Sequence, residues 1–208
     1  MYRFYLAAID MLPGAALLIP IYFILNQIYF RNSRKSILYF LFSCYLSVVY
    51  VLVGLPNVTY IRPELNLNLI PFAGMLADLK NSILNVLLFI PLGIMLPLLW
   101  NKFKTLKCTL LFGFGMSLAI ELLQTLTFRA TDVNDLITNT FGALFGFLCA
   151  KVLLQSFPST KGIADNAKIK DLLLLLMIML TVMFFLYPFV SAALWDQLLY
   201  TDHHHTET

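Results

Sequence analysis

The sequence predicts an all-α, polytopic membrane protein in which about six transmembrane helices form one bundle. The chain has 208 residues, of which 60% are hydrophobic and only 12% are charged. A soluble domain carries about a quarter charged residues, so this chain has too little polar surface to coat a water-soluble globule. Long apolar runs, and basic residues concentrated in alternate loops, support the same fold class. The composition argues against a soluble enzyme and against a disordered segment.

Six apolar runs approach the length of about 20 residues that a bilayer-spanning helix needs, and they cover residues 11–30, 37–55, 83–100, 108–127, 135–154 and 172–195. The third run is short, and its Pro91 and Pro97 predict a kink that neighbouring helices can accommodate. The sixth is almost entirely Leu, Ile, Met and Phe, so we expect an anchor that faces lipid. The residues before position 11 lack the basic start of a signal peptide and are interpreted as the beginning of the first span.

The chain is interpreted as a single membrane domain over residues 1–208. Residues 1–37 hold the first span and a basic loop, and residues 155–208 hold a linker, the sixth span and a polar outer tail. The oligomeric state is left open, because glycines that pack helices can do so within one chain or between chains.

Basic residues are unevenly distributed between the two sets of loops. Ten of the 14 Lys and Arg residues follow the first, third or fifth span, and four lie on the opposite side. Because cytoplasmic loops carry the excess of Lys and Arg, both termini of this multi-pass protein are predicted to be extracytoplasmic. The charges are dispersed and lack an aromatic reading surface, so no nucleic-acid partner is expected.

The longest outer segment, residues 56–82, changes its pattern along its length. From Glu64 to Leu69 polar and apolar residues alternate, which predicts an extended stretch at the interface. From Pro71 the apolar residues recur at helical intervals, and proline suits a first helical position. We expect a short amphipathic helix on the outer surface there.

Polar and small residues follow one helical face in each of three predicted spans. The fourth span carries Gly113, Ser117, Glu121 and Gln124; the fifth carries Asp135, Asn139, Gly142, Gly146 and Cys149, preceded by Arg129 and Asp132; the third begins with Asn81 and Asn85, followed by Phe89. The polar groups lie in the outer half of these spans. The pattern therefore predicts a polar cavity that opens to the outside between spans three, four and five.

Several of these residues also have a structural explanation. A charge at the membrane centre costs about 2.5–3.5 kcal/mol, so Glu121 requires a cation such as Arg129, or a proton. Asp132 can cap the fifth span, and Asp135 then lies near the positive end of the helix dipole. A face formed by Gly142 and Gly146 is typical of helix packing.

The remaining polar residues can be explained in the same way. Ser117 and Gln124 can form interhelical hydrogen bonds. Arg129 can extend its charge to the membrane surface, and Asn85 can satisfy carbonyl groups freed by Pro91.

The residue inventory restricts the chemistry. The histidines are His203, His204 and His205 in the outer tail, so no Ser-His pair can form in the membrane. The spans hold no His or Cys cluster, and we expect no metal and no cofactor. Paired carboxylates with an arginine can nevertheless bind a divalent cation together with a phosphate, or act as acid and base, although Asp132 and Asp135 alone are a weak signal for either. The three cysteines lie in or beside apolar runs and are expected to be small buried side chains.

Four stretches resemble the VanZ-like family of bacterial membrane proteins: NLNLIPF (66–72), NVLLFIPLGIMLPLL (85–99), SLAIELLQ (117–124) and RATDVNDLITNTFGALFGF (129–147). The resemblance covers about residues 38–154, a VanZ-like core. It implies that the family's polar residues fall on Asn85, Glu121, Gln124, Arg129, Asp132, Asp135 and Asn139. It also implies that its structural motif falls on Phe89, Pro91, Gly93, Gly142 and Gly146.

The resemblance also implies a role in the bacterial cell envelope. The founding member of the family lowers susceptibility to teicoplanin, a glycopeptide antibiotic that acts on the outer face of the membrane. The favoured hypothesis is a plasma-membrane protein that binds a lipid, a lipid-linked cell-wall precursor or a lipoglycopeptide at the outer polar cavity. A membrane enzyme that modifies a lipid headgroup, with Glu121 or Asp135 as acid or base, is an alternative. A small proton-coupled carrier is a further alternative.

Overall fold

The computed structural model describes residues 2–63, 67–68, 70–72, 78–127, 131–156 and 167–205, and the side chains of these residues outside 2–11, 67 and 198–205. Within these residues, six helices are long and apolar enough to cross a membrane: Leu12–Phe30, Ser33–Leu52, Leu79–Leu99, Leu106–Gln124, Val133–Ser156 and Ile169–Gln197. They match the six predicted spans in order. The predicted all-α, polytopic class is therefore confirmed.

The helices group into two compact units. Unit 1 comprises Met1–Ile61 and Leu174–Thr208, and unit 2 comprises Arg62–Leu173. Unit 1 contains α1 (Tyr2–Leu25), the π-helix η1 (Asn26–Phe30), α2 (Ser33–Leu52), the end of α7 (Ile169–Thr181), the π-helix η4 (Val182–Leu186) and α8 (Tyr187–His205). Unit 2 contains α3 (Leu79–Leu99), the 3-10 helix η2 (Asn101–Lys104), α4 (Leu106–Gln124) and α5 (Val133–Ser156).

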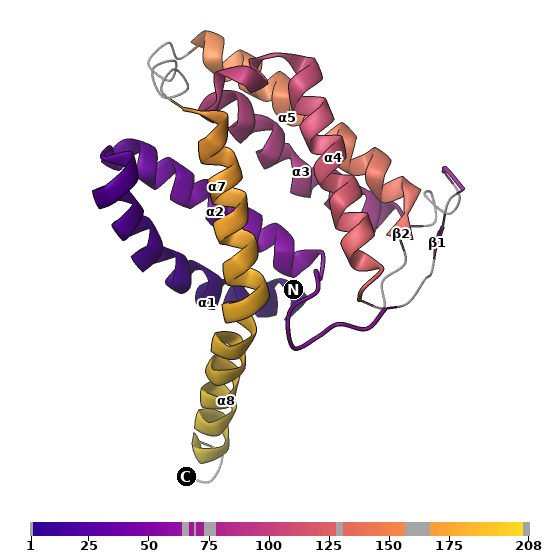
Figure 1. Ribbon diagram of the computed structural model, residues 1–208. Helices are drawn as coiled ribbons and strands as arrows, with labels where there is room; N and C mark the ends of the chain where they lie inside the picture. The colour runs from indigo at the N-terminus through magenta and orange to yellow at the C-terminus, as the bar shows by residue number, and fades with distance from the viewer. Residues whose placement is uncertain are drawn as a thin grey trace. The chain divides into compact units, whose positions relative to one another are not determined.

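In unit 1, the first two spans form a helical hairpin (Figure 1). Arg31, with φ 49°, ends η1, and the side chain of Asn32 accepts the backbone N–H of Lys35 to cap α2. A hydrogen bond between the hydroxyl groups of Tyr22 and Ser43 joins the two helices. The Asn32 contact satisfies a backbone N–H group at the start of α2. The bond between Tyr22 and Ser43 satisfies two hydroxyl groups inside the hairpin, because lipid tails offer no hydrogen-bond partner.

The sixth span is packed on one face. Met183 is fully buried, and its Sδ atom would lie 3.2 Å from a Cβ atom at Gly14 of α1. Met177 and Phe185 are exposed on other faces. The expectation of an anchor that faces lipid did not include this packed face, which forms because an apolar helix in a membrane can pack on another through shape alone.

In unit 2, α3 and α5 meet at backbone contact along a seam of glycines. A Cβ atom at Gly142 would fall 2.9 Å from the Cβ atom of Phe89 and closer still to a carbonyl oxygen of α3. A Cβ atom at Gly146 would fall 2.8 Å from the Cα atom of Gly93. Both contacts advance in the same direction along the two chains, so α3 and α5 are parallel, as helices separated by one returning span must be. Only glycine allows this approach.

The loop before α3 contributes the short strand β1 (Leu67–Asn68), which pairs in parallel with β2 (Thr131–Asp132). This confirms the extended conformation predicted for that part of residues 64–69; Glu64 and Leu69 lie outside the described residues. Phe72 has φ 64°, a left-handed conformation, and α3 begins only at Leu79. The predicted surface helix therefore does not begin at Pro71, and residues 73–77 lie outside the described residues.

The cysteines differ in their environment. Cys44 and Cys108 are half-buried, whereas Cys149 is exposed. The expectation that all three are buried is wrong for Cys149, because the buried stripe of α5 passes through Phe147 and Ala150 instead.

Candidate functional site

Most of the predicted polar residues that the structure describes lie at the end of unit 2 where α4 ends and α5 begins, beside the β1–β2 pair (Figure 1). We call this group the polar cluster and define it by the described side chains of Asn68, Ser117, Glu121, Gln124, Asp132, Asn134, Asp135 and Asn139. Its members come from the two short strands β1 and β2 and from the helices α4 and α5.

Asp132 organises the start of α5. Its Oδ1 atom accepts the backbone N–H of Asn134 at 2.8 Å, which is the helix cap that the sequence predicted. Its Oδ2 atom accepts the side-chain amide of Asn68 at 3.0 Å. The carboxylate therefore holds the helix start and the strand β1 together. Both oxygen atoms of Asp132 have partners within the protein.

Glu121 lies beneath this capping group and is 3% exposed. Its Oε2 atom accepts the backbone N–H of Asp132 at 2.9 Å. The Thr131 hydroxyl donates to the backbone carbonyl of Glu121 at 3.0 Å. The carboxyl group of α4 thus binds one of the first N–H groups of the α5 start, where the helix dipole favours negative charge.

Asn134 is a member of the cluster that the sequence analysis did not select. It is 5% exposed, and its Oδ1 atom accepts the backbone N–H of Phe72 at 2.7 Å. This bond fixes the loop at the residue with left-handed backbone conformation. Two features of the sequence could have identified Asn134. It follows a capping aspartate by two residues, and it lies within the stretch that resembles the VanZ-like family.

Deeper in the unit, Asn139 of α5 faces Ser117 of α4. Its Nδ2 atom donates to the Ser117 hydroxyl oxygen at 2.9 Å, and both side chains are buried. The Oδ1 atom of Asn139 is buried and has no hydrogen-bond partner among the described residues. A buried acceptor without a donor costs about 1–3 kcal/mol. This atom is therefore available to a donor from a water molecule or a ligand.

Gln124 and Asp135 complete the polar cluster, and Asn85 lies outside it on α3. Gln124 is buried, whereas Asp135 and Asn85 are half-exposed. The parallel contact of Gly142 with α3 puts Asn85 within about one helical turn of Asn139 along the helix axes. Arg129 lies outside the described residues, so its predicted pairing with Glu121 stays a prediction.

Four of the five predicted structural motif residues lie in the α3–α5 interface. Phe89, Gly93, Gly142 and Gly146 are buried, and Pro91 lies inside α3, which runs as one helix through it. These residues hold the backbone of α5 in place and contribute no polar group to the cluster.

Chemically, the cluster consists of carboxylate and amide groups and the Ser117 hydroxyl, and several of its oxygen atoms accept hydrogen bonds from the protein itself. Among the described residues, no three His, Cys, Asp or Glu side chains gather in a way that could hold a metal ion. The arrangement is suited to hydrogen bonding with N–H and O–H donors.

Comparison with known proteins identifies the family of this chain. The sequence profile of the VanZ/LLP1 family matches residues 36–154, more than half of the chain. The chain is 37% identical over 84 residues to protein VanZ of Enterococcus faecium, an alignment that covers 39% of this chain. It spans about half, 50%, of the length of that curated relative. No solved structure matches. The matched region includes α3, α4, α5 and the polar cluster, and the chain belongs to the VanZ/LLP1 family.

Proposed function

We propose that this membrane protein lowers the susceptibility of a bacterial envelope to teicoplanin-type glycopeptides by binding a lipid-linked cell-wall precursor at the polar cluster. Such a precursor presents N–H and O–H donors from its peptide and sugar groups at the membrane surface. Carboxylate and amide oxygens are the acceptors that such donors require. The family membership supports the resistance role, and the chemistry of the cluster supports binding.

The observation that carries this proposal is the Oδ1 atom of Asn139. It is a buried acceptor without a partner among the described residues, whereas the carboxylate of Asp132 and the side-chain oxygen of Asn134 are hydrogen-bonded within the protein. If position 139 served only to pack helices together, an apolar side chain would destabilise the fold less than a buried amide that lacks one of its hydrogen bonds. A bound donor gives this amide its second hydrogen bond.

The charge pattern supports an outer location for the cluster. Ten of the 14 Lys and Arg residues follow the first, third or fifth span, so we infer a plasma-membrane protein with both termini outside the cytoplasm. Alkaline phosphatase fused to the C-terminus should be active, and green fluorescent protein fused there should be dark. The reverse pair of results contradicts the outer location and, with it, access to wall precursors.

Teicoplanin susceptibility tests the proposal. A sensitive Gram-positive strain would express the wild type, Glu121→Gln, Asn139→Ala or Asp78→Asn, with protein levels measured in the membrane fraction. Asp78→Asn removes an exposed carboxylate of the same unit outside the cluster and is the matched control. We expect the wild type and the control to raise the inhibitory concentration and both cluster variants to lose at least half of that rise on a logarithmic scale. Equal protection by all four chains contradicts the proposed site, and no protection by an expressed wild type contradicts the function.

A further inference from the structure

A second surface of unit 2 lies on the side of α4 and α5 away from the glycine seam. It is a groove of about 280 Å³ between the two helices, lined by Leu110, Phe114, Leu136, Ile137, Thr140, Phe141 and Leu144. None of the residues of the polar cluster lines it. Phe114 is 43% exposed and Phe141 is 50% exposed, so the groove opens to the outside of the unit.

The lining of this groove suits a hydrocarbon chain. Thr140 is its one polar residue, and its hydroxyl donates to the backbone carbonyl of Leu136 at 2.7 Å. The hydroxyl is therefore satisfied within α5 and offers little to a polar ligand. From Leu136 to Leu144 the groove follows α5 for about 12 Å, since each helical residue rises about 1.5 Å. A segment of an acyl chain fits this length and lack of polarity.

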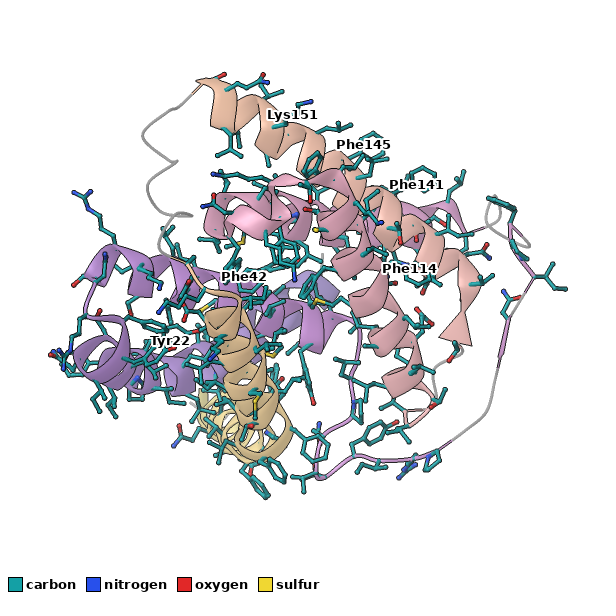
Figure 2. The ribbon with its side chains drawn as sticks, turned by 45° about the horizontal axis from the view of Figure 1, so that its top comes forward. Tyr22, Phe42, Phe114, Phe141, Phe145 and Lys151 are labelled. Atoms are coloured by element: carbon teal, nitrogen blue, oxygen red, sulfur yellow. The ribbon has the colours of Figure 1, made fainter. Side chains whose placement is uncertain are left out.

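One end of the groove leads to two lysines. Lys151 lies seven residues after Leu144, which is two helical turns, so it continues the same face of α5. Lys107 lies seven residues before Phe114 and continues the groove face of α4 in the same direction. Figure 2 shows Phe141, Phe145 and Lys151 in succession along α5. Both lysines are exposed, and neither has a hydrogen bond or ion pair among the described residues.

We propose that this groove holds one acyl chain of an anionic glycerophospholipid whose phosphate binds Lys107 and Lys151. A basic pair at the end of an apolar groove matches a lipid in both charge and polarity, because basic sites between membrane helices attract anionic headgroups. The lysine stems extend along apolar surface while their ammonium groups reach the headgroup. This lipid site is separate from the polar cluster, which lies at the opposite end of α4 and on another face of α5.

Native mass spectrometry of the purified full-length chain tests the proposal. The protein would be offered equal amounts of phosphatidylglycerol and phosphatidylcholine with identical acyl chains. The test variants are Lys107→Gln with Lys151→Gln, and Leu144→Trp, which fills the groove. The control is Lys102→Gln with Lys104→Gln, because these exposed lysines of η2 make the same change in net charge away from the groove.

We expect the wild type and the control to retain phosphatidylglycerol in preference to phosphatidylcholine. Each groove lysine should contribute about fivefold to that preference and the pair about 25-fold, as expected for about 1 kcal/mol per basic residue at an anionic surface. Leu144→Trp should reduce the binding of both lipids. Equal binding of the two lipids by the wild type overturns the proposal. An equal loss in the control pair also overturns it, because the attraction would then be general. If Leu144→Trp does not fold, the exposed lysine pair and its control still decide.

Discussion

The glycine seam between α3 and α5 predicts that Gly146→Ala destabilises unit 2. A Cβ atom at this position would lie 2.8 Å from the Cα atom of Gly93 and closer still to the carbonyl oxygen of Ile90, whereas real Cβ contacts essentially never fall below 3.0 Å. The obstructing atoms belong to backbone, so no side-chain rotation can relieve the contact. The two helices must separate instead, and overpacking of this kind costs about 1–3 kcal/mol.

A matched control isolates this steric cost. Gly115 of α4 is exposed, and a Cβ atom there would meet nothing within 4 Å. Both substitutions gain the same helix propensity, about 1 kcal/mol, so the difference between them measures the contact. For a chain of this size 1 kcal/mol corresponds to about 2–4 °C, so Gly146→Ala should melt about 2–12 °C below Gly115→Ala.

Thermal unfolding in mild detergent gives the measurement. Trp100, 1% exposed and located directly after α3, reports on unit 2 when Trp195 is replaced by Phe. Equal melting temperatures for Gly146→Ala and Gly115→Ala would refute the reasoning, because the backbones of α3 and α5 could not then be in contact at this point.

Three further predictions concern the cluster and the cysteines. Asp132→Ala removes a helix cap worth about 0.5–2 kcal/mol and the contact with β1, so limited proteolysis should cut the loop before α3 faster than in the wild type. Ser117→Ala leaves the Asn139 amide without its acceptor and should cost about 0.6–1.7 kcal/mol in thermal unfolding, whereas Ser117→Ala with Asn139→Leu should recover most of that loss. A lipid-soluble maleimide should label Cys149, which is exposed, several times faster than Cys44, and peptide mapping that found the reverse order would contradict the described burial.

The spans were predictable from the sequence because membrane insertion depends on the length and polarity of each segment by itself. The buried faces of α4 and α5 were also predictable in large part, since polar and small residues recur every three or four positions. Gly113, Ser117, Glu121 and Gln124 are all buried in α4. Periodicity identifies a buried face from one helix alone.

The partner of each face was not predictable in the same way. Asn68 binds Asp132 across 64 residues, and Asn134 binds the backbone of Phe72 across 62. No local pattern encodes such pairs, because they depend on where the loop crosses the helix ends. In a bilayer the choice of neighbour also lacks the hydrophobic driving force that acts in water. The packing of Met183 in the sixth span shows the same limit, since a uniformly apolar helix gives no sign of which face is covered.

The two proposed sites use different faces of one helix. Asn139 and the seam glycines Gly142 and Gly146 lie on the α3 and α4 side of α5, whereas Thr140 and Leu144 line the groove on the other side. A residue on one face of a helix does not contact a ligand on the opposite face. The lysine pair can therefore lose its lipid while the cluster keeps its hydrogen bonds, and Asn139→Ala can alter the cluster while the groove stays filled. A substitution that separates α3 from α5 at the glycine seam has a different effect. Gly142 lies less than one turn from Asn139, so a shift of α5 at Gly142 also moves the Asn139 amide relative to Ser117.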